Sequence, residues 1–248
     1  MPCSIRSIYR YVDQGYLSLK NIDMRRVVRY NPRKKTQPRT SPGKKIGHTY
    51  EYFLKYTEEN PEIRVVEMDL VEGRKGGKLL MTLLLRDTRL MLIYLLENKE
   101  MLGVVTVLDR LEDLLGTEEF RETFPILLTD NGSEFADPES FEYGLFNEKR
   151  TSLFYCEPRM SNQKGRLEKN HEYIRYLLPK SRSFDELTQS DVTLMMNHIN
   201  STARPGLGGR CPADLAVQCL CPETLTRLGV ELIAGDEVCL TNKLFSKK

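Results

Sequence analysis

The sequence predicts an α/β protein in which helices flank a mixed five-stranded sheet. Five apolar runs of strand length lie between residues 63 and 156. Helical periods interrupt and follow these runs, in the order strand, strand, strand, helix, strand, strand, helix. A basic segment precedes this core and a further helical period follows it, so we expect a basic N-terminal arm and a small C-terminal extension.

The first three strands are expected to form an antiparallel meander. The apolar runs are Ile63–Leu70, Leu79–Leu85 and Arg89–Leu96. Turn-forming residues at Gly73–Gly77 and Asp87–Thr88 separate them. Two short turns between three apolar runs are typical of consecutive hairpins.

The rest of the core alternates helices and strands. Apolar residues recur at helical spacing over residues 100–115, which predicts a helix there. The elements expected next are a strand at Ile126–Thr129, a short helix at Asp137–Tyr143, a strand at Leu153–Cys156 and a helix at 163–178. Pro179 ends that helix, another is expected over residues 185–200, and the segment from Arg204 is turn-rich.

One helix is expected near the N-terminus. Residues 4–12 carry an apolar helical stripe, with Ser4 as N-cap and Gly15 as the stop. Arg6 and Arg10 share the other face, which suits either a helix that contacts DNA or an ordinary surface helix. A helix-turn-helix needs preceding helices for its core, so we expect the chain to begin partway through a DNA-binding domain.

The charge is distributed unevenly along the chain. Residues 1–50 hold twelve Lys or Arg against two Asp, a net charge of +10, and the remainder has a net charge of −8. A basic arm on an acidic body suggests a polyanion bound by the arm and metal ions bound by the body. The alternative is a solvated tail without a partner. The arm residues expected to contact DNA are Arg25, Arg26, Arg33, Lys34 and Lys35.

Composition argues against a membrane protein and against a zinc protein. The longest apolar runs have strand length, which is too short to cross a bilayer. Six scattered Cys are typical of reduced thiols in a cytoplasm. The four Cys between residues 211 and 239 have irregular spacing and no His among them, unlike zinc ligands.

Three acidic residues in separate contexts are the candidate catalytic site. Asp69 and Asp130 lie at the ends of two predicted strands, and Glu168 lies near the start of a predicted helix. Carboxylates at strand ends and on a helix can converge on a pair of Mg²⁺ or Mn²⁺ ions, which prefer hard oxygen ligands. Such a metal pair is the usual apparatus for phosphodiester cleavage and joining.

Each of these acids has a competing interpretation. Asp130 stands before Asn-Gly and is therefore also a candidate turn cap. Four other carboxylates compete for the metal role: Glu67, Glu72, Glu134 and Glu172. Glu172 is the closest rival because it lies one turn beyond Glu168 on nearly the same helical face.

Three segments in order resemble bacterial DDE transposases of the insertion-sequence-thirty family, whose core is similar to retroviral integrases. Glu67–Gly73, followed by a Lys-Gly-Gly-Lys turn and an apolar strand, resembles the first catalytic segment of that family. Thr129–Phe135 resembles the second, and Phe154–Pro158 with Gln163–Arg175 resembles the third. The early residues Ser7–Asp13 resemble the end of the family's DNA-binding region.

The resemblance implies a ribonuclease-H-like fold and Mg²⁺-dependent cleavage at transposon ends, followed by strand transfer into target DNA. The matching catalytic positions are Asp69, Asp130 and Glu168, which favours Glu168 over its rival. The resemblance also implies that Lys164, Arg166 and Lys169 lie near the DNA. A dimer or larger assembly during catalysis, in a bacterial cytoplasm, is implied as well.

The resemblance assigns four parts to the chain. Residues 1–24 are a remnant of a helix-turn-helix region, 25–58 are a basic linker, 59–180 form the catalytic core and 181–248 form a helical extension. The 37 residues between the second and third acids exceed the usual spacing, and we expect the surplus at Phe146–Arg150 as a surface insertion.

Two other functions compete with an active transposase. One is a non-catalytic DNA-binding remnant that represses transposition, which the missing recognition helices favour. The other is a ribonuclease H-type hydrolase, which would need neither a basic arm nor a long C-terminal extension. The presence of all three acids favours the transposase.

Overall fold

The computed structural model describes residues 4–18, 46–144, 147–158 and 160–246, and the chain divides into two units, Met1–Thr40 and Ser41–Lys248. The described part of the first unit contains helix α1, Ile5–Asp13. The Ser4 hydroxyl accepts a hydrogen bond from the Ser7 amide at 3.2 Å, as an N-cap does. Gly15 follows the helix with a φ of 71°, a backbone conformation that favours glycine. Both predicted ends of this helix are confirmed.

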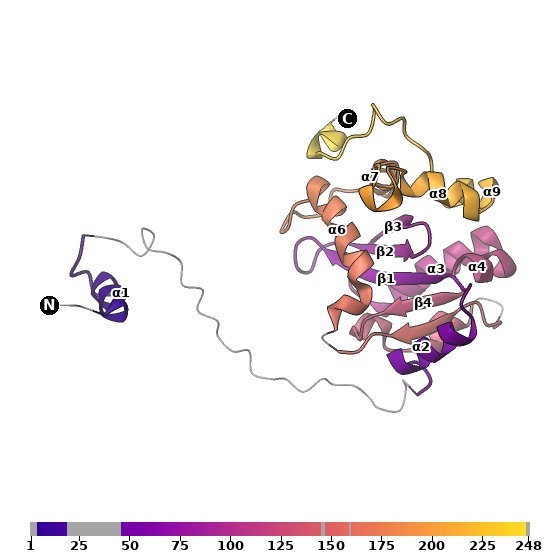
Figure 1. Cartoon of the computed structure of the whole chain (residues 1–248), viewed down its shortest axis with the longest axis horizontal. Coiled ribbons are helices and arrows are strands. Elements are labelled where there is room, and N and C mark those ends of the chain that lie inside the picture. Colours follow the sequence, from indigo (N-terminus) through magenta and orange to yellow (C-terminus); the bar gives the residue numbers. More distant parts are fainter. Residues whose placement is uncertain (1–3, 19–45, 145–146, 159, 247–248) are drawn as a thin grey trace. The chain divides into compact units, whose positions relative to one another are not determined.

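The second unit is built on one five-stranded sheet (Figure 1). Its strands are β1 (Val65–Glu72), β2 (Leu79–Leu85), β3 (Met91–Leu96), β4 (Ile126–Thr129) and β5 (Ser152–Tyr155), in the order β3-β2-β1-β4-β5. The first three strands are antiparallel neighbours, whereas β4 is parallel to β1 and β5 is parallel to β4. A meander extended by two parallel strands is the ribonuclease-H-like arrangement that we expected, and the mixed sheet is confirmed.

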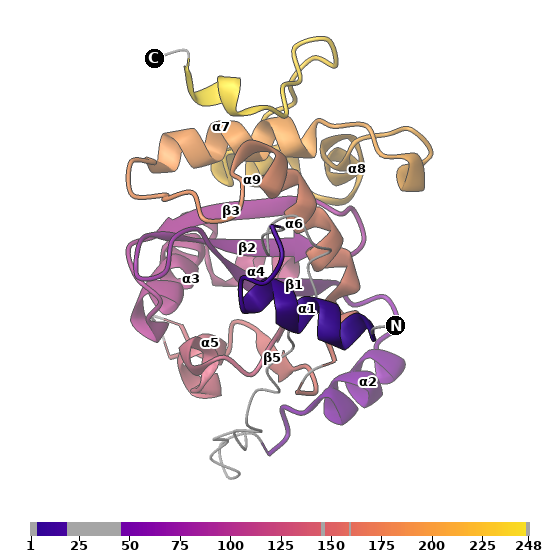
Figure 2. The ribbon, with the colours of Figure 1, turned by 90° about the vertical axis from the view of Figure 1, so that its left-hand side faces the viewer.

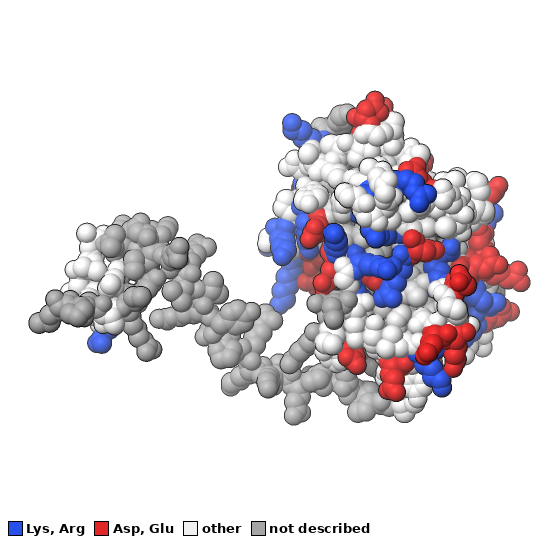
Figure 3. Space-filling view, viewed as in Figure 1, with Lys and Arg blue, Asp and Glu red and all other residues white. Residues whose placement is uncertain are grey.

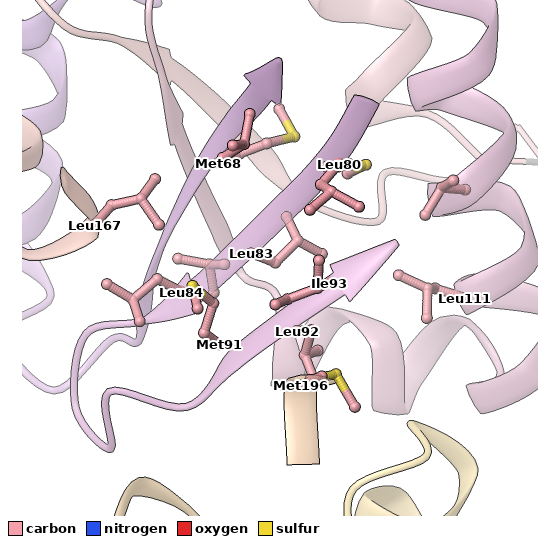
Figure 4. Close-up of a cluster of buried hydrophobic side chains, with 14 of the residues drawn as sticks. Met68, Leu80, Leu83, Leu84, Met91, Leu92, Ile93, Leu111, Leu167 and Met196 are labelled. Atoms are coloured by element: carbon pink, nitrogen blue, oxygen red, sulfur yellow. The ribbon is translucent and has the colours of Figure 1, made fainter. Parts of the chain in front are cut away.

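Helices cover both faces of this sheet (Figures 1 and 2). Helices α6 (Gly165–Leu177) and α7 (Gln189–Asn200) lie on one side, and α3 (Met101–Leu115) and α4 (Thr117–Thr123) lie on the other. Figure 4 shows Leu167 of α6 and Leu111 of α3 on opposite sides of the central strands. Because both faces are covered, all seven residues of β2 are buried, and all of them except Thr82 are apolar.

Helix α2, Tyr50–Glu59, corrects the predicted extent of the basic linker. We expected the linker to continue to residue 58, but Phe53 is only 2% exposed and belongs to a small apolar cluster with β4 and β5. Its ring lies 5.8 Å from the ring of Phe154 on β5, and the ring of Tyr56 lies 5.6 Å from the same residue. Aromatic residues at helical spacing therefore attach α2 to the sheet.

The remaining described helices are short. They are α5 (Pro138–Glu142), α8 (Pro212–Cys219), α9 (Pro222–Arg227) and the 3₁₀ turns η3 (Ser133–Phe135), η4 (Ser161–Lys164), η5 (Pro205–Leu207) and η6 (Asn242–Ser246). The two helices α8 and α9 lie in the segment that we expected to be only turn-rich. Each begins with a Pro at its first position, and a Cys before that Pro accepts an amide hydrogen bond. Within the described residues, no helix is long and apolar enough to span a membrane.

Arg150 contradicts the prediction of a surface insertion at Phe146–Arg150. Its side chain is fully buried. One guanidinium nitrogen lies 2.6 Å from an Asp109 carboxylate oxygen and 3.0 Å from one of Glu112, while Nε donates to the Phe141 carbonyl oxygen at 2.9 Å. A buried charge needs such partners, so this residue is part of the fold and only its polar neighbours are exposed.

We expect Arg150→Met to lower the free energy of unfolding by about 3–5 kcal/mol, because it leaves the buried Glu112 carboxylate without its cation. Urea denaturation monitored by circular dichroism measures this. The neighbouring substitution Lys149→Met removes an exposed cation and should cost less than about 1 kcal/mol. Equal losses in the two variants would contradict the buried network.

Candidate active site

Two of the three predicted catalytic acids lie side by side on the sheet. Glu67 of β1 is paired with Leu128 of the parallel strand β4. Asp69 lies two residues further along β1, and Asp130 lies two residues beyond Leu128, directly after the last residue of β4, so the two acids stand at equivalent positions of neighbouring parallel segments. The strands are about 4.8 Å apart. β1 continues past Asp69 to residue 72, so this acid lies within its strand and not at the end as expected.

Asp69 lies in a partly desolvated position. Its Oδ1 accepts the Leu70 amide at 2.9 Å, and its Oδ2 lies 3.3 Å from the Lys164 Nζ. Burial raises the pKa of the Asp69 carboxyl above its usual value, the Lys164 charge opposes this and the negative charge of Asp130 adds to it. The two aspartates are therefore close enough for their charges to repel each other.

Asp130 also has the turn role that competed with a metal role. Its Oδ1 accepts a hydrogen bond from the Gly132 amide at 2.9 Å, so the turn interpretation is confirmed for this oxygen. A carboxylate has about four lone-pair sites, and the turn bond occupies one of them. A cap on the turn and a ligand to a cation are therefore compatible roles for this residue.

Glu168 is not gathered with the two aspartates. It lies exposed in the first turn of α6. In the part of the chain that the structure describes, no group of three or more His, Cys, Asp or Glu side chains is placed to hold a metal ion. The helix that carries Glu168 is nevertheless attached to β1, and the catalytic assignment of this residue stays a prediction.

A buried carboxylate, Glu67, attaches α6 to the sheet. Glu67 is 1% exposed, and its Oε2 accepts the Leu167 amide of the first helical turn at 2.9 Å. Its Oε1 accepts the Arg86 Nε at 2.6 Å. Another Arg86 nitrogen donates to the Gln163 carbonyl oxygen at 2.9 Å, just before the helix. This pair fixes the position of the turn that carries Glu168.

These contacts exclude one of the competing carboxylates. Glu67 is already bound on both oxygens and is unsuited to a metal. Glu72 and Glu134 both lie near Lys99, at 2.8 and 3.3 Å. Glu172 is exposed, as Glu168 is. One feature of the sequence indicated the anchoring role of Glu67: a charged residue in a buried strand requires a partner.

His171 of α6 forms a second attachment to the sheet. Its Nε2 lies 2.9 Å from the Thr82 hydroxyl, which itself donates to the Asp69 carbonyl oxygen at 3.1 Å. A hydroxyl has one proton to donate, so the His171 Nε2 is the donor to Thr82. Burial, reinforced by the Lys164 and Arg175 charges, lowers the His171 pKa to about 4, so the ring is neutral near pH 7.

The predicted DNA-contacting residues fall into three groups. Arg10, Arg166 and Lys169 are exposed. Lys164 is buried against Asp69 and is not accessible to a DNA phosphate in this arrangement. The described residues do not include Arg25, Arg26, Arg33, Lys34 or Lys35, nor the side chain of Arg6.

We expect Glu67→Gln to lower the free energy of unfolding by about 1–3 kcal/mol, because the amide loses the charge that Arg86 and the Leu167 amide share. Hydrogen exchange at the first turn of α6 should accelerate in the same variant. The exposed acid Glu72 provides the matched control, and Glu72→Gln should cost less than about 1 kcal/mol and leave that exchange unchanged. Unaltered exchange in Glu67→Gln would show that the anchor is not at this residue.

His171 predicts an acid-sensitive stability. The folded pKa is about 4 and the unfolded value is 6.5, so between these values the unfolded chain binds a proton that the folded chain does not. Stability should therefore fall as the pH drops through this window, by up to about 3 kcal/mol from this group. Urea denaturation at several pH values gives the free energy of unfolding of wild type and of His171→Gln. The difference between the two curves reports the contribution of His171, because all other titrating groups are present in both proteins. Parallel stability curves would contradict the neutral ring.

Several transposases are similar in sequence to this chain, although no family model matches it. The transposase of insertion sequence element IS4351 from Bacteroides fragilis is 26% identical over 153 residues, which are 60% of this chain and 43% of the relative. The probable transposase of IS1161 from Streptococcus salivarius is 29% identical over 206 residues, 81% of this chain and 55% of the relative. The chain thus spans about half the length of these relatives.

A further relative comes from the family that the sequence motifs resemble. The InsI transposase of IS30A from Escherichia coli K12 is 27% identical over 150 residues, 60% of this chain and 37% of the relative. Among solved structures, the catalytic core of BIV integrase covers 62% of this chain with 17% identity and a TM-score of 0.44. The sequence relatives confirm that this chain is similar to the transposases of bacterial insertion sequences, including the insertion-sequence-thirty family.

Proposed function

We propose that this chain carries the catalytic core of a transposase that cleaves DNA at transposon ends and transfers the cut strand into target DNA. One observation carries the proposal: Asp69 within β1 and Asp130 directly after the parallel strand β4 lie close enough for their charges to interact. The transposase relatives support the assignment of this pair to DNA chemistry. Because the chain spans about half their length, the activity of the whole protein is part of the proposal.

Divalent cations suit the donors at this position. Asp69 and Asp130 offer hard carboxylate oxygens, and an ammonium cation already lies against the first of them. We propose that these residues hold Mg²⁺ or Mn²⁺, two ions per site, together with Glu168. When bound, such ions lower the pKa of an attacking water or 3′-hydroxyl and stabilise the leaving oxygen.

The rest of the site would position the substrate DNA. Arg166 and Lys169 are exposed beside Glu168 on α6, where they can contact phosphates. Arg86, Arg166 and Gln163 also line an open pocket of about 430 Å³ at the start of this helix. In Figure 3, acidic side chains gather at the right-hand edge of the molecule, near α4, and basic side chains lie across the middle of the visible surface. The DNA would follow that basic region, with two or more copies of the chain joined during catalysis.

We expect Asp69→Asn, Asp130→Asn and Glu168→Gln each to lower the rate of DNA nicking at least about a thousandfold, since each removes a charge that holds the ions. The assay incubates the purified chain with Mg²⁺ or Mn²⁺ and labelled DNA that flanks its own locus. Asp69→Asn also takes the ion-pair partner from the buried Lys164 ammonium, so circular dichroism and urea denaturation must show that this variant is folded before its nicking rate is compared.

Glu172→Gln is the control for the third acid. This residue is also exposed on α6, one turn beyond Glu168, and should retain nicking activity. Loss of activity in Glu172→Gln together with full activity in Glu168→Gln would move the third role to Glu172. Full activity in either aspartate variant would remove that residue from the site.

A further inference from the structure

Lys164 is a buried cation in contact with the proposed metal site. Its Nζ lies 3.3 Å from the Asp69 Oδ2 and 3.4 Å from the Met68 carbonyl oxygen. Only about a twelfth of its side chain, 8%, is exposed. Lysine is rarely buried to this degree unless it is paired, so the contact with Asp69 is what retains it there.

The surroundings leave Lys164 as the neutralising charge of the aspartate pair. No other described ion pair involves Asp69 or Asp130. His171 is neutral near pH 7 and contributes no positive charge, and burial raises the pKa of the nearby Cys156 thiol to about 11, so this thiol adds no negative charge. A nearby cation lowers the repulsion between two neighbouring carboxylates, and the ammonium group that contacts Asp69 is such a cation.

We propose that Lys164 competes with a divalent cation for the Asp69 carboxylate. This inference rests on the proposed function, because it concerns the same aspartates. It gives a role to a buried ammonium group that contacts one of the two proposed metal ligands. The lysine has a flexible four-carbon stem, so its ammonium group can withdraw by side-chain rotation while η4 stays in place. Withdrawal would also make this charge accessible to DNA.

The first experiment compares Mn²⁺ affinity without DNA in wild type, Lys164→Met and Lys169→Met. Electron paramagnetic resonance of unbound Mn²⁺ gives the dissociation constants. Lys164→Met should bind Mn²⁺ about tenfold or more tightly, because the competing charge is gone from the carboxylate. Lys169→Met removes an equal charge next to Glu168 without touching Asp69, and its affinity should change much less. Unchanged or weaker binding by Lys164→Met, or no binding by any of the three at millimolar Mn²⁺, would overturn the proposal.

A second experiment uses only the wild-type protein and does not depend on the folding of a variant. An amine-reactive acetylating reagent is applied with and without Mn²⁺, and the rate of modification of each lysine is measured by mass spectrometry. Lys164 should be protected without metal and become reactive at saturating Mn²⁺, whereas the exposed Lys169 should react equally in both. Continued protection of Lys164 with Mn²⁺ bound would show that the two cations coexist.

These measurements separate the inference from the function on which it rests. Nicking of flanking DNA by wild type, with no gain in Mn²⁺ affinity in Lys164→Met, would refute the competition and keep the transposase. The affinity gain and the metal-dependent labelling, without nicking of any DNA, would support the competition and refute the proposed reaction.

Discussion

Two carboxylates placed side by side on neighbouring parallel segments are the constraint on which the site depends. The β1–β4 register brings Asp69 and Asp130 close together, and partial burial strengthens their repulsion. A positive charge beside such a pair lowers the repulsion and favours the ionised form. In this structure the Lys164 ammonium supplies that charge from the segment that leads into α6. The acidic pair and the start of α6 are therefore coupled by electrostatics as well as by packing.

Every second residue of β1 lies on the same face of the sheet, and the residues on this face have different roles. Val65 packs with the apolar cluster under α2, Glu67 binds the first turn of α6, and Asp69 meets the lysine. The intervening residues Val66 and Met68 point to the other side and are fully buried in the main core. Any slip of the strand by one residue would exchange these two sets, so the large apolar core also fixes the register of the site.

The sequence predicted the helices and strands that have a clear apolar pattern. It did not predict the features that depend on tertiary contacts. The strands and the helices α3, α6 and α7 were predicted because their apolar faces repeat clearly. Helix α2 was missed because a basic segment precedes it and its apolar face is three aromatic residues on the edge of the sheet. Arg150 was assigned to the surface from its polar neighbours, although its partners Asp109 and Glu112 lie about 40 residues earlier.

The candidate site was likewise predictable from the sequence only in part. The resemblance motifs selected Asp69 and Asp130, and the structure brings those two together. The roles of Glu67, Arg86 and His171 depend on contacts across 19 to 100 residues of chain, which no local pattern encodes. Lys164 was assigned to DNA from its position in the third segment, whereas the structure places its ammonium group on an acid of the first segment.

Neighbouring residues at the start of α6 are held in different ways, two of them through the backbone and Lys164 through its side chain. Leu167 and Gln163 are held at the backbone by Glu67 and Arg86, so the start of the helix is fixed before any ion or DNA binds. Lys164 lies between them in the sequence and contacts Asp69 and Met68 through its side-chain ammonium group. A fixed backbone with a movable charge lets the cation at Asp69 change without displacement of the turn that carries Glu168. Binding of an ion would then break the Lys164–Asp69 ion pair and leave the packing of α6 unchanged.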